Sequence, residues 1–289
     1  MKKFLVLFFL LAYNISFSEE KVIVGRVIDL SSGHPISFVN IGIALKGAGT
    51  ICNEQGLFKL KLNSSINSTD TIYFSHVGYT TCKYLVNEMK DTLNTIQLVS
   101  NAVQLNEIVI TPQKKRNKVF GRNSRGLGLM HYNFYTAYEK EVDDRLSKEI
   151  GIAIKPKGDC ILEDFNIYIS SNEFSSLKFR LNFYKIEDGK PTAIIISKEI
   201  IFEIRNQYKG WFNVDLTPYH IYLNKDMGEV AATIQWIQSK KAFESSKYFG
   251  ISTSVSPTEA SFFREKSMDI WKQEKQALSF YFNSLCSFK

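Results

Sequence analysis

The sequence has few of the residues that build metal and nucleophile sites. Its 289 residues include only four histidines and four cysteines, and no His-Glu-x-x-His motif or comparable ligand set occurs. The Gly-x-Ser-x-Gly turn of serine hydrolases is missing, and no glycine-rich loop leads from a strand into a helix to hold a phosphate. We therefore expect no catalytic residues, no metal site and no cofactor.

Neighbouring carboxylates do not change this expectation. They occur at Asp143-Asp144 and at Glu163-Asp164. Adjacent residues of a strand point to opposite faces, so Glu163 and Asp164 cannot share one site unless the strand contains a bulge. A glycosidase needs two carboxylates that face one bond. We interpret these pairs as surface groups and expect the protein not to be an enzyme.

Long apolar runs are absent beyond the first residues of the chain. Lys2 and Lys3 precede an apolar run at 4–12 that is too short for a permanent membrane helix, and small residues follow at Ser16 and Ser18. This pattern is typical of a secretory signal peptide, which we assign to residues 1–18. A buried core helix is the alternative. No cysteine follows to carry a lipid anchor, and we expect no transmembrane segment after cleavage.

Positive charge exceeds negative charge, with a formal net charge of +7 at pH 7. Much of the excess lies between Lys114 and Arg125, where Gly, Asn and Ser interrupt the basic residues. Because this run lies between two β-rich stretches, we interpret 113–144 as a solvated basic linker. Weak attraction to anionic glycans is the alternative. Export argues against nucleic acid as a partner.

Short runs of β-branched and aromatic residues, separated by turn residues, fill the stretch 19–112. A strand that begins at Val22 ends at the turn-forming residues 31–35. The glycine-containing segment 46–50 is expected to end the strand that precedes it. Gly56 permits a tight reversal before an alternating strand at 58–62. The other expected strands are 36–41, 72–74, 82–86, 95–99 and 107–111. Seven short strands favour a β-sandwich.

The spaced anchors of this stretch resemble the carboxypeptidase-regulatory-like domain. The resemblance is carried by Gly25-x-Val27-x-Asp29, Val39-Asn40-Ile41, Asn53-x-x-Gly56-x-Phe58, Val77-Gly78-Tyr79 and Leu105-x-Glu107-x-Val109-Ile110. Asn53 stands where the family usually has Asp, and both side chains can cap a turn. The resemblance implies a seven-stranded transthyretin-like sandwich, not itself catalytic, of the kind common in Bacteroidota envelope proteins. It implies a location in the periplasm, at the outer membrane or on the cell surface.

Alternating apolar and polar residues continue in the stretch 145–289. The runs 177–183 and 230–236 each give one dry face and one wetter face, and turn residues such as 187–191 separate the strands. We expect a C-terminal antiparallel sandwich of jelly-roll type, so that the whole chain is all-β. Residues 209–216 and 229–237 also resemble the sandwich that follows the regulatory-like domain in other exported Bacteroidota proteins, which implies an architecture and no reaction.

The four cysteines allow three pairings if all are oxidised. Cys160 opens the first strong strand of the second domain and Cys286 closes its last strand. First and last strands of a sandwich are often neighbours, so a disulfide between Cys160 and Cys286 can form. Four buried or free thiols are the alternative, because no spacing resembles a zinc knuckle or a redox Cys-x-x-Cys.

Large aromatic residues provide the candidate ligand-binding surface. Trp211 lies beside a glycine, Tyr219 follows a proline, and Tyr222 comes just beyond. We predict that these three rings are exposed, where the apolar face of a sugar can stack on them. Trp236 continues an apolar alternation and is predicted to lie in the core.

Two classes of function remain open. In the first, a non-catalytic exported envelope protein binds or scaffolds an outer-membrane or envelope protein partner or a surface polymer. In the second, the chain is a carbohydrate-recognition or enzyme-accessory module that binds a glycan through its C-terminal sandwich. An exposed edge strand in the first domain favours the first class, because strand addition needs only backbone groups. An exposed Trp211 with polar neighbours favours the second.

Overall fold

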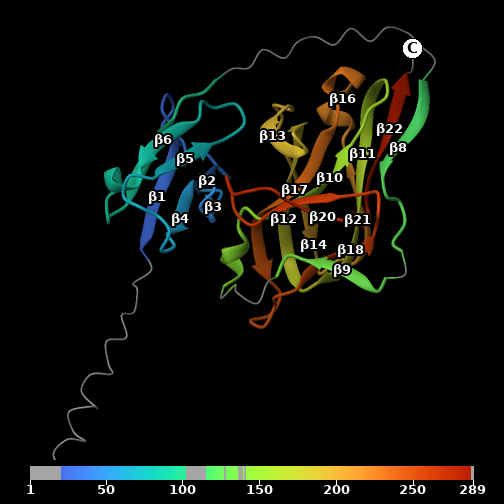
Figure 1. Ribbon diagram of the computed structural model, residues 1–289. Helices are drawn as coiled ribbons and strands as arrows, with labels where there is room; N and C mark the ends of the chain where they lie inside the picture. Colours follow the sequence, from blue (N-terminus) through green and yellow to red (C-terminus); the bar gives the residue numbers. More distant parts are fainter. Residues whose placement is uncertain (1–20, 102–114, 127, 136–138, 140, 288–289) are drawn as a thin grey trace, which may run out of the picture.

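The computed structural model describes residues 21–101, 115–126, 128–135, 139 and 141–287. These residues form β-strands and short 3-10 helices, arranged as two β-rich domains that Figure 1 shows side by side. The prediction of an all-β chain with two domains is confirmed. The signal peptide at 1–18 and the expected strand at 107–111 lie outside the described residues. Within the described part, no helix has the length and apolar composition needed to cross a membrane.

The first domain is a sandwich of a three-stranded and a four-stranded sheet. The order of the first sheet is β4 (Leu57–Lys61), β1 (Val22–Asp29), β7 (Asn94–Leu98). The order of the second is β3 (Ala48–Ile51), β2 (Asn40–Ile43), β5 (Thr71–Ser75), β6 (Cys82–Leu85), and the 3-10 helix η1 (Val86–Glu88) follows. The break expected at 46–50 is instead a tight reversal at Gly47, with a φ of 63°, that leads into β3.

Alternation along the strands fills the core of the first domain. In β4 the side chains of Phe58 and Leu60 point inward, and in β5 those of Ile72 and Phe74 do the same. The rings of Phe58 and Phe74 meet edge to face with centroids 5.6 Å apart. Each such buried side chain stabilises the fold by about 1.5–3 kcal/mol relative to exposure to water. The first domain therefore has a hydrophobic core of its own.

The second domain is a larger sandwich of a seven-stranded and an eight-stranded sheet. The strands of the seven-stranded sheet are β10 (Glu149–Ile154), β12 (Phe174–Glu187), β13 (Lys190–Ile194), β14 (Ile200–Arg205), β17 (Val230–Lys241), β19 (Ser261–Arg264) and β20 (Lys272–Glu274). Those of the eight-stranded sheet are β8 (Lys115–Gly121), β9 (Met130–Asn133), β11 (Asp159–Asn172), β15 (Gly210–Asp215), β16 (Ile221–Leu223), β18 (Phe249–Val255), β21 (Gln276–Leu278) and β22 (Phe280–Ser287). The 3-10 helices are η2 (Val142–Arg145), η3 (Thr217–Tyr219) and η4 (Lys225–Met227).

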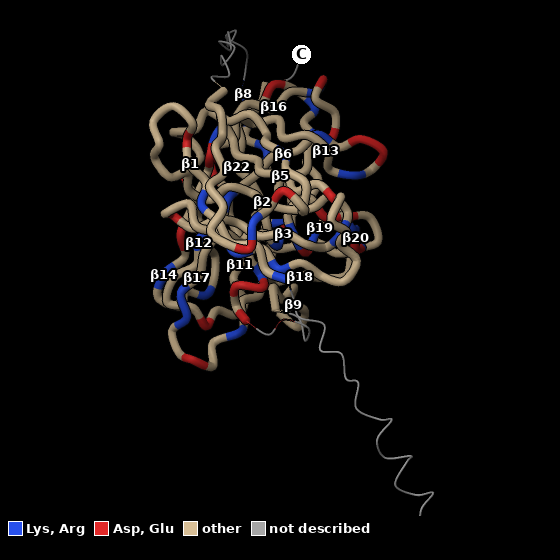
Figure 2. The backbone as a smooth tube through the Cα atoms, turned by 90° about the vertical axis from the view of Figure 1, so that its left-hand side faces the viewer, with Lys and Arg blue, Asp and Glu red and all other residues tan. Residues whose placement is uncertain are grey.

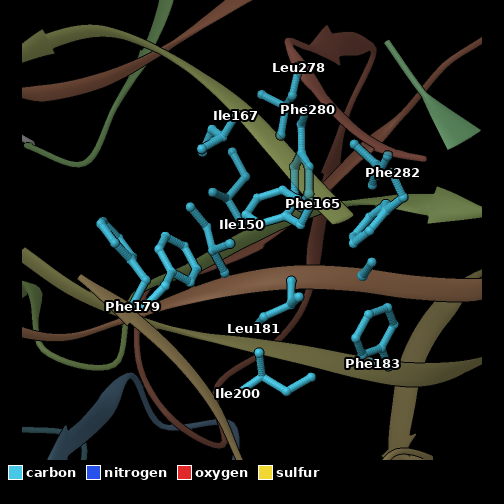
Figure 3. Packing of buried hydrophobic residues seen from close by; sticks show 14 of the residues in the cluster. Ile150, Phe165, Ile167, Phe179, Leu181, Phe183, Ile200, Leu278, Phe280 and Phe282 are labelled. Atoms are coloured by element: carbon cyan, nitrogen blue, oxygen red, sulfur yellow. The ribbon is translucent and has the colours of Figure 1, made fainter. Parts of the chain in front are cut away.

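An aromatic core lies between these two sheets. Phe165 of β11 meets Phe280 of β22 with ring centroids 4.6 Å apart, and Phe179 of β12 contributes from the other sheet, as Figure 3 shows. Trp236 of β17 is fully buried, which confirms its assignment to the core. Cys160 and Cys286 face each other in register on β11 and β22, and a disulfide joins them.

The prediction of a solvated linker at 113–144 is wrong for the residues described there. β8 pairs antiparallel with β22, and β9 pairs with β18, so both belong to the eight-stranded sheet. Phe120 and Phe134 reach the core of the second domain. A basic composition is compatible with an edge strand. Such a strand can keep its Lys and Arg side chains in water while one aromatic side chain anchors the strand to the core.

The first domain covers part of the outer face of the seven-stranded sheet (Figure 1). Arg180 Nη2 donates to the carbonyl oxygen of Phe38 at 2.6 Å, and Gln235 Nε2 donates to Asn40 Oδ1 at 2.9 Å. A Cβ atom at Gly42 would overlap the carbonyl oxygen of Ser267, so glycine permits the close approach of the domains. Figure 2, viewed from the side of the first domain, shows acidic and basic residues interspersed on this side of the molecule.

Candidate binding face

The outer face of the eight-stranded sheet is built by strand alternation. In β11 the side chains of Phe165, Ile167 and Ile169 are fully buried in the core. Asn166 and Tyr168 lie between them in the sequence and so point to the opposite side of the sheet. β15 and β22 pair with opposite edges of β11, so their outward side chains extend the same face.

Three aromatic rings lie at one end of this outer face. Tyr168 is directly opposite Trp211, and Tyr281 lies on the neighbouring strand β22. Trp211 makes edge-to-face contacts with both rings, with centroids 5.4 Å from Tyr168 and 5.1 Å from Tyr281. All three are partly exposed. We call Tyr168, Trp211 and Tyr281 the aromatic trio.

A row of side-chain amides continues from the aromatic trio along the same strands. Asn213 Nδ2 donates to Asn166 Oδ1 at 2.9 Å, and Asn166 Nδ2 donates to Asp164 Oδ1 at 2.5 Å. From the other side, Asn283 Nδ2 donates to Asp164 Oδ1 at 2.9 Å. We call Asn166, Asn213 and Asn283 the amide row. Asn166 is buried and bonded to both Asp164 and Asn213, whereas Asn213 and Asn283 reach solvent and each bond one neighbour. An amide has more donor and acceptor positions than these bonds use.

Carboxylates follow the amide row. Asp164 is directly opposite Asp215, and β11 has a bulge between Leu162 and Asp164 that leaves both Glu163 and Asp164 partly exposed. Because of this bulge, Glu163 and Asp164 are not held to opposite faces of the sheet as they would be in a regular strand. We call Glu163, Asp164 and Asp215 the carboxylate end. Within the described part of the chain, no group of three or more His, Cys, Asp or Glu side chains is arranged to hold a metal ion.

Hydrogen bonds and charges set the ionisation of groups on this face. The hydroxyl and backbone N–H of Thr217 donate to Asp215 Oδ1 at 2.7 and 2.9 Å and lower the pKa of Asp215. Burial raises the pKa of Tyr281, and the negative charge of Asp164 raises it further. The Tyr281 hydroxyl therefore remains protonated and can donate a hydrogen bond at neutral pH.

The structure separates the three rings that the sequence grouped together. Trp211 lies at the centre of the aromatic trio. Tyr222 of β16 lies on the same outer face but further along β11, where its hydroxyl donates to Asp159 Oδ1 at 2.7 Å. Tyr219 ends η3, where it is partly exposed and also packs against the core of the second domain, apart from the aromatic trio.

Sequence reasoning missed Tyr168, Tyr281 and the amide row. The signal was present, because Tyr168 alternates with buried Ile167 and Ile169, and Tyr281 lies between buried Phe280 and Phe282. What the sequence does not contain is the pairing of β11 with β15 on one side and β22 on the other. Only that pairing brings the three rings within contact.

The disulfide lies beneath the far end of the same strands. Cys160 and Cys286 are both fully buried, on the core side of β11 and β22. The bond therefore joins the two central strands of the outer face covalently. Cys52 and Cys82 of the first domain are free thiols, and burial raises the pKa of Cys52 to about 11. Cys52 is therefore a protonated core residue at neutral pH.

An edge strand of the first domain is the feature through which a protein partner could bind. β6 ends the order of the four-stranded sheet, and among the described residues it pairs only with β5. Its residues Lys83 and Leu85 are exposed. An edge of this kind can accept a strand from another chain, but β6 is only four residues long.

Comparison with known proteins identifies a family match in the first domain, and that match does not extend to the second domain. Residues 23–110 match the family model of the CarboxypepD_reg-like domain, which confirms the resemblance of the first stretch. No curated protein matches the chain.

Solved structures are similar only at low scores. Two structures of BcpA, the major pilin subunit of Bacillus cereus, have TM-scores of 0.19 and 0.18 at 12% and 10% identity, and each alignment covers 90% of this chain and 69% of the pilin chain. A structure of infectious bursal disease virus, Gt strain, has a TM-score of 0.28 at 8% identity and covers 91% of this chain and 62% of the viral chain. Likeness at this level supports no inference about function.

Proposed function

We propose, from the CarboxypepD_reg-like first domain and the geometry of the second, that the protein is an exported, non-catalytic binding module that holds a glycan on the outer face of its eight-stranded sheet. The observation that carries the proposal is the contact of the aromatic trio around Trp211 beside the hydrogen-bonded amide row. The first domain serves to position this face.

The physical basis is the two-sided character of a sugar ring. A pyranose has an apolar C–H face, which a flat aromatic ring desolvates, and a rim of hydroxyl groups, which needs hydrogen-bond partners. The partly exposed rings of the aromatic trio supply the apolar surface, and the exposed Asn213 supplies donors and acceptors beside it. Because Asn213 is already held by Asn166, which Asp164 fixes in turn, little side-chain freedom is lost when a ligand binds.

Hydrolysis is disfavoured by the state of the carboxylates. Asp164 and Asp215 face each other, as a glycosidase pair does. A general acid at neutral pH needs a raised pKa, whereas hydrogen bonds from Thr217 lower that of Asp215. Asp164 accepts hydrogen bonds from two amides, which hold it in place as an acceptor. These features support binding without bond cleavage.

Binding is tested with the purified protein on a panel of immobilised polysaccharides. We expect Trp211→Ala to weaken retention on the bound polymer by at least about tenfold, which corresponds to about 1.4 kcal/mol. Phe243→Ala is the matched control, because Phe243 is an exposed aromatic residue outside the face. Equal retention of both variants, or binding to no polysaccharide, would refute the proposal. Release of reducing ends from the bound polymer would refute its non-catalytic part.

Export is a separate part of the proposal and rests on the sequence pattern at 1–18. It is supported by the CarboxypepD_reg-like domain, which resembles that of envelope proteins. Cell fractionation and mass spectrometry of the N-terminus provide the test. A cytoplasmic protein that retains residues 1–18 would overturn this part without affecting the glycan face.

A protein partner at β6 is the second candidate, favoured by the edge of that strand, which has no pairing partner among the described residues. A photo-crosslinking residue at position 83, in the exposed part of β6, would capture such a partner in intact cells. A single recurrent product, lost when the crosslinker is moved to position 187 in the second domain, would support this candidate. The absence of any product at position 83 would leave the glycan face as the binding surface.

A further inference from the structure

The carboxylate end has no cationic partner within the described residues. Ion pairs within 4.0 Å connect many Lys and Arg side chains to carboxylates elsewhere, for example Lys61 to Asp144 and Arg264 to Glu149. No ion pair among the described residues includes Glu163, Asp164 or Asp215, and Asp164 and Asp215 are opposite each other on adjacent strands. Like charges placed opposite each other destabilise a sheet. This face therefore holds negative charge that its own side chains do not neutralise.

A ligand on the aromatic trio must approach these carboxylates. Successive outward residues of a strand are about 7 Å apart, so Trp211 and Asp215 are separated by about 13 Å along β15. Asn213 lies between them. A glycan chain that stacks on Trp211 and extends over the amide row therefore brings its next groups over Asp164 and Asp215.

Lys115 is the basic residue of β8 that points to the same face, because Phe120 points to the core and side chains alternate along a strand. In register, Val119 is opposite Asn283, which is opposite Asp164, whereas Lys115 is opposite Ser287. Lys115 is thus about 13 Å further along the strand from the row of Asp164. The screening length in about 0.1 M salt is about 10 Å, so Lys115 neutralises little of the field at Asp164.

We propose that this face selects an uncharged or amine-bearing glycan and rejects polyuronates, with Asp164 and Asp215 as the residues that set this selectivity. The inference rests on the proposed function and adds the chemical class of the ligand. It opposes the expectation from the net charge of +7, which predicts attraction to anionic polymers. Local charge decides here because the ligand lies directly over the carboxylates.

The test compares one polymer in two charge states. The neutral polysaccharide that binds best is compared with the same polymer oxidised at C6 to the uronate. We expect oxidation to weaken binding at least tenfold in dilute buffer, and we expect this ratio to fall in about 1 M salt, where the screening length is about 3 Å. In Asp215→Asn and Asp164→Asn the ratio should fall below about threefold, since the charge is removed with little change of shape.

The controls separate the two proposals. Glu244→Gln removes an exposed carboxylate away from the face and should leave the ratio unchanged. A urea unfolding curve that matches that of the native protein shows that Asp215→Asn is folded. If no neutral polymer binds, the proposed function fails. If the oxidised polymer binds as tightly as the neutral one, or if the Asp variants leave the ratio unchanged, the selectivity proposal alone fails.

Discussion

The two outer faces of the second domain belong to one sandwich and carry different chemistry. On the seven-stranded sheet, Glu149, Arg180 and Gln235 are almost completely buried beneath the first domain and neighbouring segments. On the eight-stranded sheet, Trp211 and Tyr281 remain partly exposed. The covered face uses charges that are paired with each other. The open face uses rings and amides whose bonding capacity is only partly used, which is what a surface for an outside ligand requires.

The covered face is organised around Glu149. Its carboxylate accepts hydrogen bonds from Arg264 Nη2 at 2.7 Å, from Asn182 Nδ2 at 2.9 Å and from Thr233. A buried ion pair contributes little net stability over an apolar replacement, but removal of one partner leaves the other charge buried and unpaired. The covered face is therefore the more sensitive of the two faces to single substitutions.

The largest expected effect follows from Glu149→Ala. Arg264 would remain buried without a counter-charge, and we expect the free energy of unfolding to fall by about 3–5 kcal/mol. Urea denaturation followed by tryptophan fluorescence measures this change. The double variant Glu149→Met with Arg264→Leu should recover much of the loss, because neither charge is then buried alone. A double variant less stable than Glu149→Ala would contradict this account of the covered face.

A smaller effect is expected at the contact between the domains. Ala at position 42 suits a strand but would force its Cβ against the carbonyl group of Ser267, at a cost of about 1–3 kcal/mol. We expect Gly42→Ala to separate the domains without unfolding them, so that small-angle scattering reports a larger radius of gyration. Thr95→Ala, at an exposed position of β7, is the control. An unchanged radius for Gly42→Ala would show that the contact tolerates the extra atom.

The contact between the domains should also weaken in acid. Burial alone raises the pKa of Glu199, but the hydrogen bond from His76 and the charge of Arg180 lower it below the ordinary value of 4.5. A depressed carboxyl pKa contributes stability that is present above about pH 4.5 and is lost as the pH falls through the lowered value. The stability difference between the native protein and Glu199→Gln should therefore shrink as the pH falls below about 4.5. A difference independent of pH would exclude Glu199 as the titrating group.

The two faces also differ in how far the sequence predicts them. Period-two alternation assigns Trp236 to the core and marks 177–183 and 230–236 as strands, because burial of one sheet face imposes this pattern directly. Alternation cannot show which outward face another domain will cover. Arg180 and Gln235 are polar residues at outward positions and are nevertheless buried, because the first domain supplies their partners.

The candidate site was predicted only in part for a related reason. The position of Trp211 beside Gly210 is a local signal that predicts its exposure. Tyr281 is far from Trp211 in the sequence, and the two meet only because β22 and β15 flank β11. The basic run near Lys115 forms an edge strand and not the predicted linker, because composition does not distinguish the two. Long-range pairing is the information that local patterns lack.

The smallest expected effect on stability is that of Trp211→Ala on the open face. Trp236→Ala in the core serves as its comparison. Trp236→Ala removes a fully buried ring and should lower the free energy of unfolding by about 3–5 kcal/mol. Trp211→Ala removes two edge-to-face contacts from a partly exposed ring and should lower it by about 1 kcal/mol. Urea denaturation of both variants gives the comparison. If Trp211→Ala is as destabilising as Trp236→Ala, Trp211 is a structural residue and any loss of glycan binding would follow from unfolding. If it is nearly as stable as the native protein yet does not bind, the ring acts on the ligand directly.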